Sequence, residues 1–317
     1  MTPVVAFAYN RKDKIEKCLN SLSKCNGARE TKVFVFSDGP KNDKDKYMVN
    51  EVREILKSFK EKGFFRDFII YESETNKGLA QNIISGINSI LAMSDSVIVI
   101  EDDLIFSNDF LEYMNKALSF YKNDTRIGEI SGYHYPINEL NEYKQDAFLL
   151  KKGECWGWGT WKDRWEKVDW NVECFDDYMI NPGMRRKFDN LELGFDDMLV
   201  DQHNKRNNSW AIRWCFHLYL NNLFVVYPKY SKVSNCGFDG SGTHCSSQGK
   251  YVCDFHNGTD EMSFDNIIYD KKLAKKSSYY PIKSIKGTKG IIFHLLVREL
   301  KFVWHVWLGI CKKYHRV

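Results

Sequence analysis

Three consecutive carboxylates, Glu101, Asp102 and Asp103, are the residues of this chain whose types and spacing point most directly to chemistry. They follow the apolar run SVIVI at residues 96–100, which predicts a buried strand that ends in three acids. Adjacent carboxylates at a strand end repel one another, and a bound cation commonly offsets that cost. Ligands that are all oxygen favour Mg²⁺ or Mn²⁺, ions that also bind substrate phosphates. The alternative is a solvated turn that caps the next helix.

Polar residues also follow two other predicted strands. Asn10 and Arg11 come after the run VVAFAY, and Asp38 comes directly after the run KVFVFS. In open parallel sheets, ligands bind at the carboxyl ends of the strands. We therefore expect Arg11, Asp38 and the acidic triplet to meet at one edge, where an ion could neutralise the charge of a departing diphosphate.

The elements that must position these residues alternate along the first 135 residues. Short β-type runs at residues 4–9, 32–37, 67–72 and 96–100 are separated by helical periodicity, which is typical of a mostly parallel sheet with crossover helices. No GxGxxG follows the first strand and no GxxxxGK[ST] occurs, which weakens a dinucleotide oxidoreductase or a P-loop interpretation. The expected fold class is α/β.

The second half of the chain has a different character. The Trp-rich run CWGWGTW at residues 155–161 has alternating glycines that suit neither a regular helix nor a plain core strand. Residues 209–222 predict a helix and residues 223–228 a strand, and a polar loop with three glycines follows at residues 237–245.

The charge is divided between a body and a tail. Residues 271–317 carry twelve Lys or Arg and one acid, a net +11, so the chain's +4 leaves −7 on residues 1–270. The tail predicts a helix with one polar stripe, made of His294, Arg298, Lys301 and His305. Its basic ends and apolar, Trp-containing face are typical of a helix that lies on an anionic membrane surface. Packing against the rest of the chain or a second subunit is the alternative.

Several features bear on location and partners. The longest uncharged apolar stretch near the end, residues 302–311, is about half of the roughly 20 residues that a membrane span needs. The N-terminus lacks the pattern of a signal peptide, and nine Cys without a CxxC favour reduced thiols. We expect a cytoplasmic protein, peripheral on the inner face of the plasma membrane. Nucleic acid is not an expected partner, because the net positive charge is confined to the tail while the body is −7.

Four segments occur in an order and spacing that we can compare with a known family: VVAFAYNRKDKIEKCL, VFVFSDG, NKGLAQN and VIVIEDDLIFSNDFLEYM. The chain resembles nucleotide-sugar glycosyltransferases of the GT-A fold, both the large family-2 group and the N-acetylglucosaminyltransferase I group, whose metal motif is also Glu-Asp-Asp. The resemblance implies a Rossmann-like, mostly parallel sheet with flanking helices. Residues 1–135 would bind the nucleotide sugar, residues 136–270 would form the acceptor-binding half of the same domain, and residues 271–317 would be the basic amphipathic tail.

The resemblance also implies roles for residues that would bind the donor. Arg11 would contact the nucleotide, and Asp38 would bond the base, which favours uracil and hence a UDP-sugar. Lys77 and Gly78 would lie near the diphosphate or ribose. Without the family match, Arg11 and Lys77 could equally be solvated helix ends, and Gly78 a glycine that begins a helix.

A second set of implied roles concerns the metal. Asp103 would bind Mn²⁺ or Mg²⁺, and Asp102 would reach the ribose or the donor sugar. His244, in the glycine-rich loop, would ligate the ion or contact the diphosphate, as a late His does in several GT-A enzymes. A lone His is more often structural.

Inverting transfer needs a carboxylate that removes the proton of the acceptor hydroxyl. In the N-acetylglucosaminyltransferase I group this acid lies in a Trp-Asp-Asp-Trp element, and its counterpart at residues 210–214, WAIRW, lacks it. The remaining candidates are Asp196, Asp197 and Asp239; Asp197 is favoured because family-2 enzymes place an acid just before the helix in this region. Each could instead be a helix cap or loop charge. Arg213, in the vacant place, could hold diphosphate oxygens or pair with an acid.

The Trp-rich run would supply the acceptor side. Trp156, Trp158 and Trp161 would form a wall, because flat rings stack on the apolar faces of sugars; the alternative is a core cluster. The expected function is metal-dependent transfer of a sugar from a UDP-sugar to a hydroxyl of a glycan or lipid-linked oligosaccharide in surface polysaccharide synthesis, with inversion as the expected outcome. The alternatives are a catalytically decayed glycan-binding protein and a sugar-phosphate nucleotidyltransferase.

Overall fold

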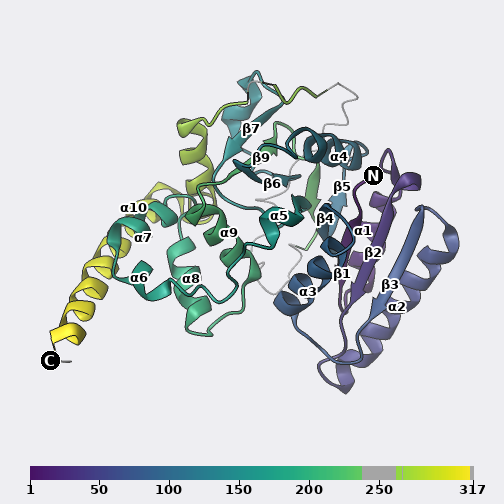
Figure 1. Ribbon diagram of the computed structural model, residues 1–317, viewed down its shortest axis with the longest axis horizontal. Coiled ribbons are helices and arrows are strands. Elements are labelled where there is room, and N and C mark those ends of the chain that lie inside the picture. The colour runs from purple at the N-terminus through teal and green to yellow at the C-terminus, as the bar shows by residue number, and fades with distance from the viewer. Residues whose placement is uncertain (238–261, 266, 315–317) are drawn as a thin grey trace.

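A mixed sheet with helices on both faces organises the computed structural model, which describes residues 1–237, 262–265 and 267–314 (Figure 1). The sheet contains eight strands, in the order β3 (Asp67–Glu72), β2 (Lys32–Ser37), β1 (Val4–Ala8), β4 (Ser96–Glu101), β8 (Trp158–Trp161), β6 (Ile127–Ser131), β9 (Phe224–Pro228) and β7 (Ala147–Leu150). A small ladder beside it pairs β5 (Leu104–Phe106) with β10 (Val233–Asn235). The expected α/β fold is confirmed.

The strands predicted from the first 135 residues form one parallel block. β3, β2, β1 and β4 pair in parallel, so their carboxyl ends meet at one edge. β8 is antiparallel to both of its neighbours, β4 and β6, and β7 is antiparallel to β9. Because β6 and β9 are parallel to each other, most strands run the same way, as predicted.

Helices cover both faces of the sheet. They are α1 (Lys12–Leu22), α2 (Asp43–Lys62), α3 (Leu79–Leu91), α4 (Phe110–Phe120), α5 (Lys162–Trp165), α6 (Phe175–Met179), α7 (Pro182–Asp189), α8 (Phe195–His203), α9 (Trp210–Leu220) and α10 (Lys271–Tyr314). Val4 and Ala6 of β1 share one core with α1, α2 and α4, whereas Val5 and Phe7 share the opposite core with α3 and α9. This burial on both faces explains why the parallel strands are continuously apolar.

The second half of the Trp-rich run, residues 158–161, forms the strand β8, which corrects the expectation for that half, whereas Gly157 just before it has a φ of 65°. Trp158 of β8 lies between Val99 of β4 and Ser131 of β6. Gly159 is needed there because a Cβ at this position would lie 2.9 Å from the carbonyl oxygen of Val97. Close approach of neighbouring backbones, and not irregular structure, therefore accounts for a glycine in this run.

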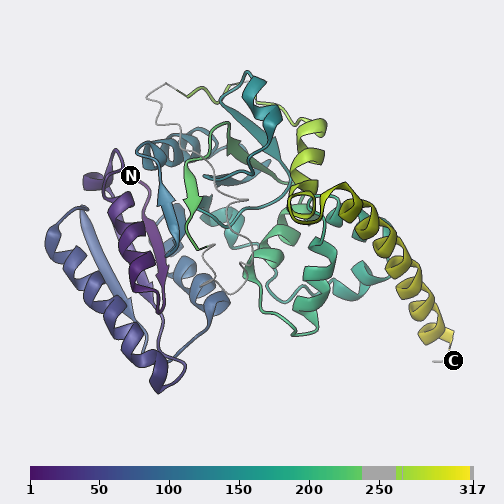
Figure 2. The same cartoon turned by 180° about the vertical axis from the view of Figure 1, so that it is seen from behind.

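The C-terminal helix α10 packs on a small helical cluster formed by α6, α7, α8 and one side of α9 (Figure 2). It kinks at Gly287, whose φ is 63°. Three residues of its polar stripe face the protein: His294 and Arg298 bond Asp189, and Lys301 bonds Asp197. Phe302 beside them is buried, and the side chain of His305 lies outside the described ones. The structure thus agrees with the alternative interpretation of the tail, in which the helix packs on the rest of the chain. Among the described residues, no helix is both long enough and apolar enough to cross a membrane.

Candidate active site

The carboxyl ends of β1 and β4 bring a guanidinium and two carboxylates together. Arg11, which follows β1, directs Nη2 and Nε to the two carboxylate oxygens of Asp102, the latter over 3.3 Å. Its Nη1 donates to Asp103 Oδ2 over 3.0 Å. Such a fork fixes both acids at the edge of the sheet. The predicted meeting of Arg11 with the acidic triplet is therefore present.

The acids outnumber the positive charge that faces them. Burial, together with the charges of Asp103 and Asp102, raises the pKa of Glu101 to about 8. Burial also raises the pKa of Asp102 to about 6, although Arg11 acts in the opposite direction. The pKa of Arg11 is itself raised, because the attraction of the two aspartates outweighs the effect of burial. One guanidinium does not balance this set of acids, and a further cation would favour their ionised forms.

The residues at this edge suit a hard divalent ion. Of the two aspartates that bond Arg11, Asp103 has the more exposed side chain. Its Oδ1 lies 3.3 Å from Asn235 Nδ2. The carboxylates of Asp102 and Asp103 offer oxygen ligands, which suit Mn²⁺ and Mg²⁺. Within the described part of the chain, no group of three or more His, Cys, Asp or Glu side chains has the arrangement of a complete metal site. Residues 238–261, with His244 and Asp239, lie outside the described residues.

Asp38 has a different local task from the one predicted. Its Oδ1 accepts from the backbone N–H of Gly39 and Lys77, and its Oδ2 accepts from Gly78 N–H and Asn76 Nδ2, over 2.8–3.1 Å. A carboxylate has about four acceptor positions, so all are taken. Asp38 therefore holds the loop before α3, and a base could bond it only by displacing one of these donors.

That loop brings two further predicted residues to the same edge. Gly78 precedes α3 with φ of 76°, a conformation that favours glycine, and a Cβ there would meet no other atom within 4 Å. Its role in beginning the helix is thus visible, while the Lys77 side chain is exposed. The predicted contacts of these residues with a diphosphate or ribose stay predictions.

Two of the three tryptophans expected on the acceptor side belong to the core. Trp158 and Trp161 are 0% and 2% exposed. The Trp158 ring stacks on Trp210 at a centroid distance of 5.4 Å, and Trp161 Nε1 donates to the carbonyl oxygen of Leu118. The wall interpretation is therefore wrong for both, because neither ring can reach a ligand. Trp156 is only partly buried and stays a candidate.

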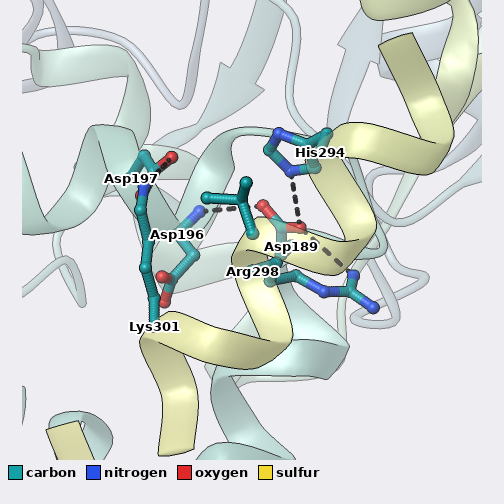
Figure 3. A pocket seen from close by; sticks show the side chains of 7 residues that line it. Asp189, Asp196, Asp197, His294, Arg298 and Lys301 are labelled. Atoms are coloured by element: carbon teal, nitrogen blue, oxygen red, sulfur yellow. Dashed lines mark hydrogen bonds and ion pairs between the residues drawn. The ribbon is translucent and has the colours of Figure 1, made fainter. Parts of the chain in front are cut away.

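Two of the three acids predicted as catalytic bases, Asp196 and Asp197, are held in ion pairs of the helical cluster, and Figure 3 shows the pair of Asp197 with Lys301. Asp196 is buried and accepts from Arg185 Nε and Nη2 over 2.9 and 2.8 Å, and from the Tyr178 hydroxyl over 2.6 Å. Both oxygens of Asp197 accept from Lys301 of α10, over 2.7 and 2.9 Å. The cavity between these residues is about 10 Å³, room for no more than a water molecule. Asp196 is consequently a structural acid, which corrects its assignment as a base.

Arg213 is likewise engaged within the protein. Its Nε donates to the Ser209 carbonyl oxygen, its Nη1 to the Trp170 carbonyl oxygen and its Nη2 to Asn208 Oδ1, each over 3.1 Å. It thus ties the start of α9 to the segment after α5. It pairs with no acid of the described residues, and its predicted contact with diphosphate oxygens stays a prediction.

Two acids of the site were missed by the sequence-based selection. Glu129, on β6, is fully buried; its Oε1 accepts from the backbone N–H of Glu154 over 2.8 Å, and its Oε2 accepts from the indole N–H of Trp214. Glu154 stands just before the Trp-rich run and is partly exposed. The available signal was an isolated acid at the start of an aromatic, glycine-rich run. Its meaning depends on β8 lying beside β4, which only the fold reveals.

Comparison with known proteins gives a family match and distant structural likenesses. The family model described as "Glycosyl transferase family 2" matches residues 4–189. A search of curated proteins finds no match. Among solved structures, the mannosyltransferase PcManGT from Pyrobaculum calidifontis, in complex with GDP-Man and Mn²⁺, is 13% identical with a TM-score of 0.41, over 70% of this chain and 68% of that chain. S. aureus TarS 1-349 is 14% identical with a TM-score of 0.39, over 72% and 60%. The chain thus spans less than two thirds of the latter.

Proposed function

The chain belongs to glycosyl transferase family 2, and from that premise we propose that it is a metal-dependent enzyme that moves a sugar from a UDP-sugar to a hydroxyl of a glycan or lipid-linked acceptor. The predicted resemblance and the glycosyltransferase class are confirmed by the family match. The observation that supports the finer proposal is the cluster of Arg11, Asp102 and Asp103 at the carboxyl edge of the matched strands. We further propose inversion and a role in surface polysaccharide synthesis.

Each residue of the cluster has a task in this proposal. Asp103 would hold Mn²⁺ or Mg²⁺, which when bound supplies positive charge against the leaving diphosphate. Asp102, fixed by the Arg11 fork, presents carboxylate oxygens to the hydroxyls of the ribose or donor sugar. Asp38 keeps the loop of residues 75–78 in place at the start of α3. The chain therefore contributes orientation and charge at one edge of the sheet.

The donor is the first thing to test. We expect the wild-type protein to bind and slowly hydrolyse at least one UDP-sugar in Mn²⁺, measured by calorimetry and by release of the nucleoside diphosphate. A panel of UDP- and GDP-sugars, each with Mn²⁺ or with EDTA, identifies the base and the metal requirement together. Hydrolysis would reject the decayed glycan-binding alternative. Failure of every nucleotide sugar to bind, with or without metal, would contradict the proposal.

A second part of the proposal concerns the surface of α10. Six apolar residues on it are 55–72% exposed: Ile292, Phe293, Leu296, Leu300, Val303 and Trp304. They lie on the face opposite Arg298 and Phe302, which the protein buries. Lysines in the first part of the helix are also exposed, at Lys275, Lys283 and Lys286. We propose that this face docks on an anionic membrane at the cytoplasmic side, where each Lys adds roughly 1 kcal/mol of attraction.

Replacement of exposed apolar residues of this surface by acids should release the protein from lipid. We expect the double variant Leu296→Asp/Leu300→Asp to lose at least about 10-fold in affinity for vesicles containing phosphatidylserine, since it places two like charges against an anionic surface. Co-sedimentation at low and high salt measures the change, and donor hydrolysis should stay at the wild-type rate. Met93→Asp is the matched control, because Met93 is 64% exposed outside this surface.

Two outcomes would count against membrane docking. Equal vesicle binding by the double variant and the wild type would exclude the α10 surface as the site. A wild-type dimer in light scattering that the double variant loses, with no vesicle binding by either, would assign the same surface to a second copy of the chain.

A further inference from the structure

We propose that Glu154 is the general base of the transfer reaction, an inference that rests on the proposed function of the same edge. The proton of the acceptor hydroxyl would pass to the Glu154 carboxylate as the hydroxyl oxygen forms its bond to the anomeric carbon. The bond from that carbon to the diphosphate oxygen breaks at the same time, and the nucleoside diphosphate leaves with the electron pair. A single displacement of this kind inverts the anomeric centre.

The position of Glu154 follows from the register of the sheet. β8 is antiparallel to β4, with Trp158 opposite Val99, so the residues just before β8 leave the sheet at the edge where β4 ends in the acidic triplet. Glu101 is on the same side of β4 as Val97 and Val99, which belong to the core shared with α3 and Trp158. Electrostatics agree: burial raises the pKa of the Cys155 thiol, and the charges of Glu154, Glu101 and Asp103 each raise it further.

The backbone of Glu154 is held while its carboxylate stays available. Glu129 accepts the Glu154 N–H, and Glu129 is itself fixed by the indole N–H of Trp214. The Glu154 Oε1 accepts only from the N–H and the thiol of Cys155, and Oε2 accepts no hydrogen bond from the described residues. Glu129 is therefore a positioning residue, and Glu154 is a partly exposed residue whose Oε2 is not engaged by the described part of the chain.

Trp214, which bonds Glu129, belongs to the WAIRW element at residues 210–214, where the acid of the N-acetylglucosaminyltransferase I group is absent. Trp214 closes that element, and its indole reaches Glu129 and so the Glu154 backbone. The other candidates are less suited, since Asp196 is locked to Arg185 and Asp197 is paired with Lys301.

The surroundings of Glu154 tune it for proton uptake near neutral pH. Burial raises its pKa to about 7, although the charge of Lys152 opposes this effect. The titratable groups that interact with it come from several segments: Glu129, Tyr135, Lys152, Cys155, Glu192, Cys215 and Tyr227. A base is most effective when its pKa lies close to the working pH. Glu154 has that property, whereas the salt-bridged acids of the helical cluster do not offer a free carboxylate.

The test compares Glu154→Gln with the wild type, using the nucleotide sugar of the panel that the wild type hydrolyses fastest and water as the acceptor. We expect the turnover number to fall by about 10²–10⁴-fold, while the dissociation constant for the donor in Mn²⁺ changes by less than about twofold. The wild-type rate should decline below about pH 7 as Glu154 is protonated, and this acid limb should be absent from the variant. Glu154→Asp should restore part of the rate, and Glu166→Gln, an exposed acid on the turn after α5, is the matched control.

The outcomes separate this inference from the proposed function. If the wild type binds no nucleotide sugar, the proposed function fails. If the wild type hydrolyses the donor and Glu154→Gln does so at the same rate with the same acid limb, only the assignment of Glu154 is overturned. Loss of turnover in Asp197→Asn with retention in Glu154→Gln would return the role to Asp197. The assignment of Glu154 would also be overturned if two results occurred together. The first is a lower melting temperature for Glu154→Gln, and the second is a folded Glu154→Asp protein that keeps the full rate but shows no acid limb.

Discussion

Asp103→Asn should reduce Mn²⁺-dependent hydrolysis of the donor by about 100-fold, with the fold intact. The amide keeps the size of the side chain and can still accept from Asn235 Nδ2, which lies 3.3 Å from Asp103 Oδ1. It removes the negative charge that would hold the ion and that attracts Arg11 Nη1. A loss of about 3 kcal/mol of charge stabilisation corresponds to a rate decrease of about 100-fold. Steady-state rates over a Mn²⁺ titration measure the effect.

The control for this variant is Asp95→Asn. Asp95 has 79% of its side chain exposed and pairs with Lys122 on the surface, so the change should leave the rate within about twofold of the wild type. EDTA should lower the wild-type rate as far as the Asp103 substitution does. A wild-type rate in Asp103→Asn, or in EDTA, would show that the acidic triplet does not serve a metal.

Much of the nucleotide-binding half could be predicted from sequence because its signals are local. Apolar runs such as SVIVI report strands that are buried on both faces, and the residues after them fall at one edge by topology alone. The meeting of Arg11 with Asp102 and Asp103 needed no more than this rule. The task of Asp38 was beyond it, since the four donors that occupy its carboxylate come from the turn itself and from a loop almost forty residues later.

The second half was harder because its residues depend on distant partners. Trp158 has the composition of an aromatic ligand platform, but β8 inserts between β4 and β6 and buries its ring. Asp196 lies in the first turn of α8, as a catalytic acid can, but Arg185 of the preceding helix pairs with it. In the tail, periodicity separated a polar stripe from an apolar face, but the contact of Arg298 with Asp189 and the burial of Phe302 show that the protein covers both the polar stripe and part of the apolar face.

Asp196→Ala should destabilise the folded protein by about 3–5 kcal/mol, because it leaves the Arg185 guanidinium buried without its partner. Arg185 is 1% exposed, and its remaining neighbour is the ring of Phe302, 4.5 Å from the guanidinium carbon. The change in the free energy of unfolding is measurable by urea denaturation followed by tryptophan fluorescence.

The matched control is Asp201→Ala on the same helix. Asp201 pairs with Arg206 at the surface, with both side chains at least 44% exposed, so its removal should cost less than about 1 kcal/mol. The double variant Arg185→Met/Asp196→Leu should recover most of the stability, since apolar side chains of similar size often replace a buried ion pair without loss. Equal losses in Asp196→Ala and Asp201→Ala would contradict a structural ion pair. Below its melting temperature, Asp196→Ala should retain donor hydrolysis, because a residue that acts by holding α7 to α8 affects the fraction of folded enzyme and not the chemical step.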